Sequence, residues 1–172
     1  RRPKMNIRKT TLLISVFTMM IIGAATVSAQ TSGSITLTGT VSAILQITVT
    51  PVAGYDSLDL TTSQTNLAVA TVNEKSNNAA GYTVSIESTN AAATSSTTAY
   101  LEGATHGETL DYSVSYGGTP VSLDASGQAI VTDEAAKTTS AGVDNSVQIT
   151  YTGAFLNADS YSDTLTFTIT AK

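Results

Sequence analysis

Apolar and polar residues alternate from residue 34 to residue 49, and this pattern constrains the fold more than any other feature of the chain. One parity holds the apolar and small residues Ile35, Leu37, Gly39, Val41, Ala43, Leu45, Ile47 and Val49. The other parity is polar, with Ile44 as the exception. Such alternation predicts an extended strand with one buried face. The strand is either the first strand of a sandwich or an arm that inserts into another molecule.

The first 29 residues have the pattern of a secretory signal peptide. Arg8 and Lys9 precede an apolar run over residues 12–22, and the small-residue sequence Val27-Ser28-Ala29 follows it. We therefore expect export and cleavage after Ala29, so that the mature protein begins at Gln30. An uncleaved membrane anchor is the alternative, although the apolar run is short for a span.

Residues 1–4 precede Met5, and we expect translation to start at this methionine. Removing 29 residues from the 172 leaves 143, which suits one domain. The mature chain then contains three lysines and all 13 acidic residues, so its net charge is −10. Such a charge repels phosphate backbones and excludes nucleic acid as a partner. The chain has no cysteine, so burial and strand pairing must hold an exported fold together without disulfides.

Alternating β-branched residues and turn signals recur through the mature chain and predict an all-β domain. Strands are expected at 67–72, 82–87, 110–116, 129–131, 147–151 and 161–169, besides the first one. A hairpin turn at Gly117-Gly118 should bring Val121 and Leu123 back against the strand before it. Loops or turns are expected at 52–59, 77–81 and 90–98, and a short helical turn at 133–138. Short strands separated by such turns favour a β-sandwich.

Few residues suggest catalysis or metal binding. His106 is the single histidine, no Gly-x-Ser-x-Gly sequence occurs, and neither a thiol nor a histidine pair is present. The scattered carboxylates could bind calcium if loops converged, but solvation of an acidic surface is the stronger interpretation. These carboxylates are Asp133, Glu134, Asp144, Asp159 and Asp163. We expect no catalytic residue, no metal and no cofactor.

Two segments at the ends of the mature chain carry a family resemblance. Residues 33–43, in which a glycine interrupts alternating apolar residues, resemble the N-terminal arm of chaperone–usher pilins. Residues 158–169 resemble the last strand of those subunits, which opens with an aromatic residue after a short turn. Residues 81–88 and 110–118 are similar to the cysteine-poor archaic branch, including spore-coat-U-like proteins. The chain departs from many pilins in having no disulfide and in ending Ala171-Lys172.

The resemblance implies an immunoglobulin-like β-sandwich, residues 42–172, that lacks one strand. The donor-strand arm, residues 30–41, would complete a neighbouring subunit through Ile35, Leu37, Gly39 and Val41. Leu165, Phe167 and Ile169 would line the groove or contact a chaperone. The implied partners are copies of the chain or other pilin subunits, a periplasmic chaperone and an outer-membrane usher. The implied location is the periplasm in transit and then the cell-surface fimbrium, with a role in adhesion or biofilm.

Two other functions stay open at this point. The first alternative is a self-complete, secreted immunoglobulin-like domain that binds a ligand or matrix, with residues 34–49 as its own first strand. An enzyme is a more distant possibility and would need a cleft in which His106 lies beside a serine and a carboxylate. The strand count around the core distinguishes the pilin-like subunit from the self-complete domain.

Overall fold

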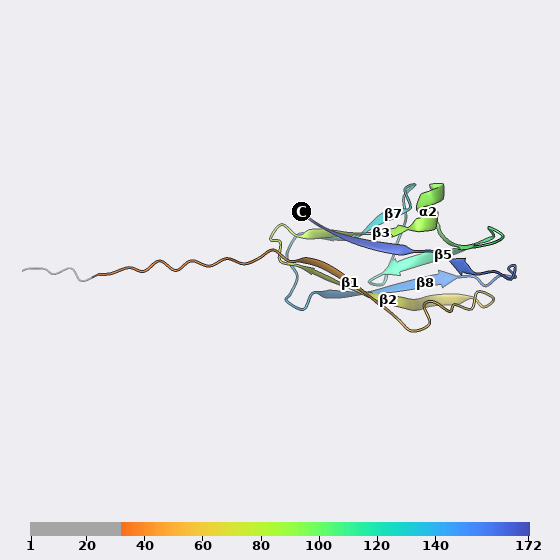
Figure 1. Cartoon of the computed structure of the whole chain (residues 1–172), viewed down its shortest axis with the longest axis horizontal. Coiled ribbons are helices and arrows are strands. Elements are labelled where there is room, and N and C mark those ends of the chain that lie inside the picture. Colours follow the sequence, from red (N-terminus) through yellow and green to blue (C-terminus); the bar gives the residue numbers. More distant parts are fainter. Residues whose placement is uncertain (1–31) are drawn as a thin grey trace, which may run out of the picture. The chain divides into compact units, whose positions relative to one another are not determined.

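Two antiparallel β-sheets face each other in the part of the chain that the structure describes (Figure 1). The computed structural model describes residues 32–172, so the signal peptide and the start at Gln30 lie outside it. Residues 41–172 form the domain with the two sheets, and residues 32–40 belong to a separate unit. The architecture is all-β and sandwich-like, as the alternating patterns predict.

The larger sheet has seven strands in the order β1-β2-β8-β5-β4-β9, with β6 paired to β5. Along the chain these are β1 (Leu45–Pro51), β2 (Gln64–Ser76), β4 (Ala99–Gly103), β5 (Thr109–Tyr116), β6 (Thr119–Pro120), β8 (Val143–Tyr151) and β9 (Tyr161–Ser162). The smaller sheet has the order β10-β3-β7, with β3 (Tyr82–Ser88), β7 (Gln128–Glu134) and β10 (Leu165–Ala171). One short helix, α2 (Thr89–Thr94), follows β3.

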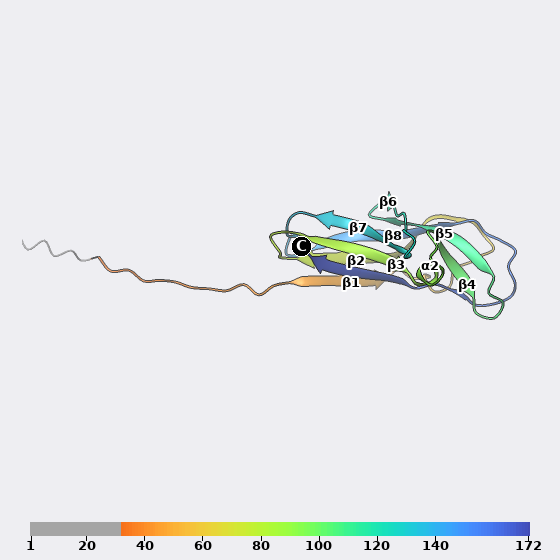
Figure 2. The ribbon, with the colours of Figure 1, turned by 90° about the horizontal axis from the view of Figure 1, so that it is seen from above.

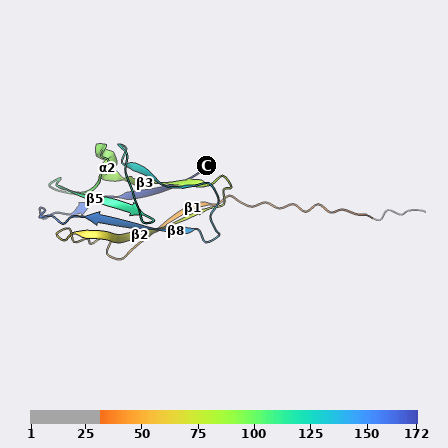
Figure 3. The ribbon, with the colours of Figure 1, turned by 180° about the vertical axis from the view of Figure 1, so that it is seen from behind.

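The larger sheet curls strongly, which carries β5 away from the layer formed by β2 and β8 (Figure 3). The register of β2 against β8 shifts twice, between Gln64 and Leu67 and again between Ala68 and Ala70. Asn66 has a φ of 53°, so the chain is locally left-handed within the first irregularity. Extra residues of this kind bend a strand and increase its twist. The sheet therefore resembles a half-barrel that closes over the smaller sheet.

The core lies between the sheets and is built from residues of one parity on each strand. Val72, Val84, Ile86 and Val147 are almost completely buried. Each buried side chain of this size contributes about 1.5–3 kcal/mol relative to an exposed one. Three tyrosines from β5 and β8 add aromatic bulk to the same cluster, Tyr112, Tyr116 and Tyr151. This burial holds together a chain that has no disulfide.

A buried carboxylate links the two sheets. Glu74 on β2 is fully buried, and its Oε1 accepts hydrogen bonds from the hydroxyls of Tyr116 (2.5 Å) and Thr132 (2.7 Å). Its Oε2 accepts one from the Tyr82 hydroxyl at 3.0 Å. Tyr116 belongs to the larger sheet, whereas Tyr82 and Thr132 belong to the smaller one. Burial, together with the hydrogen bond to Glu74, raises the pKa of both tyrosines, so they remain neutral donors.

Most of the expected strands form, with changes in length. The strands expected at 82–87, 110–116, 129–131 and 147–151 lie within β3, β5, β7 and β8. The weak strand at 67–72 belongs to the 13-residue β2, the longest strand of the domain. The hairpin after Gly117-Gly118 also forms, because Val121 N donates to Val114 O at 2.9 Å. The loop at 52–59 and the turn at 77–81 also lack strand structure.

The first expected strand was too long. Only Leu45–Pro51 forms a strand, and residues 32–44 belong to no helix or strand. β1 ends its ladder with β2 where Leu45 pairs with Ser76, because the chain turns after β2 toward β3. Alternation predicts an extended chain with one apolar face, but a strand also needs a partner for its backbone groups. Residues 34–44 therefore have the sequence of a strand without pairing in one.

Three further expectations were wrong. Residues 90–98 were expected to be a loop, but α2 forms there because Ser88 Oγ caps it by accepting from Ala91 N. Residues 133–138 form no helical turn, since β7 continues to Glu134 against β3. The strand expected over 161–169 is divided, with β9 in the larger sheet and β10 in the smaller one. β4 was not anticipated at all.

Asp163 marks the point where the chain changes sheets. Its carboxylate accepts the hydroxyls of Ser88 and Tyr112, each at 2.6 Å, and the backbone N–H of Asn90 at 3.1 Å. These contacts join the end of β3, the start of α2 and the middle of β5. These contacts hold the corner between β9 and β10. After the corner, β10 joins the smaller sheet as an edge strand.

Candidate functional site

A groove runs between β1, one edge strand of the larger sheet, and β10, one edge strand of the smaller sheet. The two strands lie at the same side of the sandwich but pair with different sheets (Figure 2). The groove has a volume of about 330 Å³, and apolar side chains form most of its lining. The lining includes Val49, Pro51, Leu58, Val69, Leu101, Val147, Ile149, Leu165 and Phe167. Asp163 is the charged residue among them.

The groove reaches the hydrophobic core. Val147 and Ile149, which are buried members of the core cluster, also line the groove. Leu165 and Phe167 on β10 are half-buried and form one wall, and Val49 on β1, 44% exposed, lines the same groove. Apolar surface that stays in contact with water is unfavourable by about 25 cal/mol per Å². The core is therefore incompletely covered between these two strands.

The backbone of β10 is unpaired on the side away from β3. β10 pairs with β3 over its whole length, from Leu165–Ser88 to Ala171–Tyr82, and no strand of residues 32–172 is hydrogen-bonded to its other edge, although β1 lies beside it. Half of its N–H and C=O groups therefore point away from β3, as in any edge strand. Leu165, Phe167 and Ile169 face the interior and are half-buried, while the threonines between them are exposed. An added strand would find backbone partners here and apolar side chains beneath.

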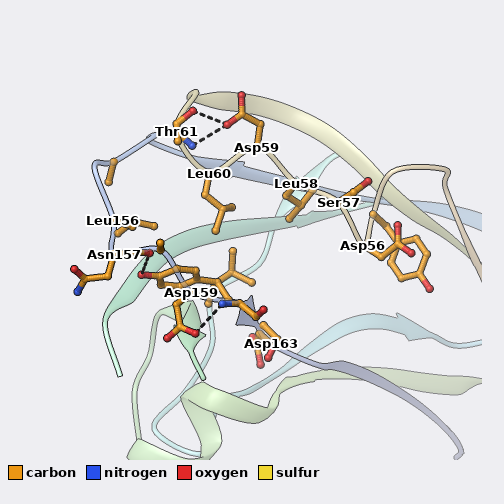
Figure 4. A pocket seen from close by; sticks show the side chains of 17 residues that line it. Asp56, Ser57, Leu58, Asp59, Leu60, Thr61, Leu156, Asn157, Asp159 and Asp163 are labelled. Atoms are coloured by element: carbon orange, nitrogen blue, oxygen red, sulfur yellow. Dashed lines mark hydrogen bonds between the residues drawn. The ribbon is translucent and has the colours of Figure 1, made fainter. Parts of the chain in front are cut away.

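Two further pockets lie at the ends of β1 and β10. At one end a pocket of about 420 Å³ is lined by Val41, Ala43, Leu45 and Ala171. At the other end a pocket of about 760 Å³ lies under the loops around residues 55–61 and 154–163 (Figure 4). The larger pocket shares Tyr55, Leu58, Leu101 and Asp163 with the central groove. The open surface thus extends from the central groove to the larger pocket, whereas the smaller pocket shares no lining residue with the groove.

Two carboxylates of the larger pocket, those of Asp59 and Asp159, accept hydrogen bonds from the loops that carry them or lie beside them. Asp59 accepts from Thr61 N and Oγ1 and from Thr62 Oγ1, and the Thr61 hydroxyl bond lowers the pKa of Asp59 most (Figure 4). Asp159 accepts from the backbone N–H of Thr105 at 2.7 Å, which likewise lowers the pKa of Asp159. These carboxylates therefore stabilise the conformation of the loops.

The acidic residues expected as possible calcium ligands do not converge. Asp133 is paired with Lys172, and Asp144 accepts from Asn73 Nδ2 at 2.7 Å. Asp159 and Asp163 serve the loop and the corner described above. Within residues 32–172 no three acidic or histidine side chains gather in a way that could hold a metal ion.

His106 lies in the loop between β4 and β5, with its side chain 52% exposed. Its Nδ1 is 3.4 Å from Asp159 Oδ2, and its backbone N–H donates to the same oxygen at 3.0 Å. The histidine and the carboxylate therefore lie together, as a triad would require. The same carboxylate oxygen is shared with two backbone amides, so its role in this loop is to hold the turn.

The arm residues have exposed apolar side chains. Ile35 and Leu37 are 83% and 84% exposed, and Val41 is 88% exposed. A Cβ atom added at Gly39 would meet no atom within 4 Å. Nothing in the described part of the molecule explains a glycine at this position or an apolar parity around it. Both features suit an environment supplied by another chain.

Phe167→Ala is expected to lower the free energy of unfolding by about 2 kcal/mol, less than the 3–5 kcal/mol of a fully buried phenylalanine. Phe167 is half-buried and packs with a tilted ring against Tyr116, with ring centroids 5.9 Å apart. Thr168→Ala on the exposed face is the matched control and should change stability by less than about 0.5 kcal/mol. Urea denaturation of both variants measures the difference, and equal midpoints would refute the inward placement of Phe167.

The scan against protein-family models and the search of the curated proteins both found no match to this chain. The groove and the arm are therefore the features that bear on function. No helix among residues 32–172 has the length and apolar character to cross a membrane.

Proposed function

We propose that this protein is a structural subunit of a bacterial surface filament, and that the arm of one copy fills the groove of the next. One observation carries the proposal: the core is open between two edge strands, in a chain that also has an exposed segment with one apolar parity. Strand addition to an exposed sheet edge is a general mode of recognition, with main-chain hydrogen bonds for affinity and alternate side chains for specificity.

The arm and the unpaired edge of β10 are similar in length. Residues 34–41 would span about 26 Å as a strand, at roughly 3.3 Å per residue, and the seven residues of β10 would span about 23 Å. Every second residue of the arm is apolar or glycine, so the side chains facing the groove would be Ile35, Leu37, Gly39 and Val41. Burial of the three larger side chains would contribute about 1.5–3 kcal/mol each.

The arm and the groove are also complementary in charge. No charged residue occurs from Gln30 to Tyr55, and Asp163, the charged residue in the groove lining, already accepts hydrogen bonds from its own domain. A neutral segment can therefore enter the groove without leaving a charge unpaired. Gly39 would allow close backbone approach at one point of the contact.

Insertion of each arm into the next subunit is a heterologous contact, which extends into a fibre unless it closes into a ring. Before assembly, the open edge of β10 would promote aggregation, so a periplasmic chaperone is the expected partner until an outer-membrane usher adds the subunit. The self-complete surface domain is a weaker proposal, because it requires residues 34–44 to form a paired strand. The ladder with β2 covers only residues 45–51, and beyond it only Ser42 and Ile44 are held, by Asn77.

The test supplies the arm in trans. A domain of residues 42–172 should bind a synthetic peptide of residues 30–41 in a 1:1 complex and unfold at a higher temperature. At a peptide concentration 100 times the dissociation constant, the stabilisation should be about 2.7 kcal/mol. The same peptide carrying Leu37→Asp is the control and should not stabilise the domain. Equal unfolding temperatures with the two peptides would refute the proposal.

A further inference from the structure

Asn77 holds the chain segment that connects the arm to β1. This segment, residues 42–44, is called the arm root. Asn77 Oδ1 accepts from Ile44 N, and Asn77 Nδ2 donates to Ser42 O, each at 2.7 Å. The backbone N–H of Asn77 also donates to Ile44 O at 3.1 Å. The side-chain amide thus continues the β1–β2 ladder beyond its last pair, Leu45 and Ser76, and keeps the root in line with β1.

In a polymerising subunit, the subunit's own arm competes with the arm of a neighbour for the same groove. The arm is tethered next to that groove, and a short flexible tether gives an effective concentration in the millimolar range. A neighbouring subunit at micromolar concentration would be at a disadvantage of about 1,000-fold. Polymerisation therefore requires that the arm be unable to reach its own groove in a productive register.

For the arm to fold back into its own groove with its apolar side chains facing inward, the chain would need a turn at the arm root. A three-residue turn over residues 41–43 would place Leu37 beside Ile47 and Ile35 beside Val49, with the apolar parities matched. This turn must rotate the Ser42 carbonyl out of the line of β1. The hydrogen bond from Asn77 Nδ2 to Ser42 O prevents that rotation.

Turns elsewhere give poor alternatives. A two-residue turn would shift the register by one position and direct the polar parity of the arm toward the groove. A three-residue turn over residues 39–41 would leave Ser42 in place but would set Gly33 beside Ile47. No apolar side chain would then extend as far as Val49 in the central groove.

We propose that Asn77 is a positioning residue that prevents the arm from turning back into the groove of its own subunit, and so directs the arm to a second copy. The inference rests on the proposed exchange of arms. The Asn77 contacts would explain why a tethered arm binds a neighbour rather than its own subunit. A single side chain in the turn between β2 and β3 would then decide between the two grooves.

The experiment uses the full chain and the fact that it has no cysteine. Thr36→Cys and Thr48→Cys, which would pair in the same register but lie on the exposed polar parity, are introduced together. A short thiol-reactive crosslinker then reports whether an arm meets its own groove or that of another copy. The parent pair should give a ladder of intermolecular products. Adding Asn77→Ala should make the crosslinked monomer the major product, with at least a tenfold rise in its ratio to the ladder.

Two further variants test the cause. Asn78→Ala is the matched control in the same turn. The Asn78 side chain donates a hydrogen bond to Lys172 O and accepts one from Ala80 N, but it forms none with the arm root. It should give the same ladder as the parent. Asn77→Asp keeps the acceptor for Ile44 N but loses the donor to Ser42 O, so it should behave like Asn77→Ala.

An unchanged ladder with Asn77→Ala would overturn the positioning role. Equal gains of crosslinked monomer with Asn77→Ala and Asn78→Ala would also overturn it, since they would reflect a weakened turn. Thermal unfolding of each variant confirms that the domain is folded when it is crosslinked. A complete lack of intermolecular product in the parent would instead overturn the proposed function, and the inference with it.

Discussion

Leu37→Asp in the arm is expected to abolish filament formation while leaving the domain folded. Leu37 is 84% exposed within one molecule, so the substitution changes almost nothing there. In the groove of a neighbour it would lose about 2 kcal/mol of apolar burial and would place an unpaired carboxylate against the core. The combined loss of at least about 4 kcal/mol corresponds to roughly 1,000-fold weaker association. Electron microscopy of the filament yield measures the effect.

Thr38→Asp provides the matched control for that experiment, because Thr38 lies on the opposite parity and would face solvent in the inserted arm. Its filament yield should stay close to that of the parent. Gly39→Val should also block assembly, although the structure leaves open space around Gly39 within the molecule. Normal filaments from Leu37→Asp and Gly39→Val would refute arm exchange and favour the self-complete surface domain.

Glu74→Ala is expected to have the largest effect on stability, a loss of at least about 3 kcal/mol. The substitution leaves the hydroxyls of Tyr82, Tyr116 and Thr132 without their common acceptor in the core. Each unsatisfied buried hydroxyl costs about 1–3 kcal/mol, and the smaller side chain leaves a cavity as well. Denaturant unfolding followed by circular dichroism measures the loss.

Two variants define the cause of the Glu74 effect. Glu102→Ala removes an exposed glutamate from β4 and should change stability by less than about 0.5 kcal/mol. Glu74→Leu combined with Tyr82→Phe, Tyr116→Phe and Thr132→Val removes donors and acceptor together, and should recover most of the loss. If Glu74→Ala alone unfolds at the same denaturant concentration as the parent, the buried network is not what joins the two sheets.

The groove could be anticipated only in part. The apolar parity of Leu165, Phe167 and Ile169 predicts a strand with a buried face, and the structure places that face inward. The sequence does not say that β10 lies at an edge, because edge position depends on which strands the chain brings alongside. The Leu58/Leu60 pair in the loop after β1 was a visible signal, since apolar residues in a loop need a surface to cover.

Other features were missed because their cause is not local. β4 has no long alternation, and it forms because β5 and β9 offer backbone partners on both sides. The division of residues 161–169 follows from the donors that meet Asp163, which come from Ser88, Asn90 and Tyr112, far away in the sequence. Glu74 reads as an ordinary surface glutamate in the sequence, although three hydroxyls from distant strands surround it.

Side-chain periodicity and charge are local properties, and they suffice to predict the all-β class, most strand positions with the faces they bury, and the neutral, alternating character of the arm. Only the folded chain shows where the strands stop pairing, which two edges face each other, and which polar groups meet in the core. Those outcomes depend on backbone hydrogen bonds between residues distant in sequence. The open groove between β1 and β10, the Glu74 network and the Asn77 contacts to the arm root all belong to this second group.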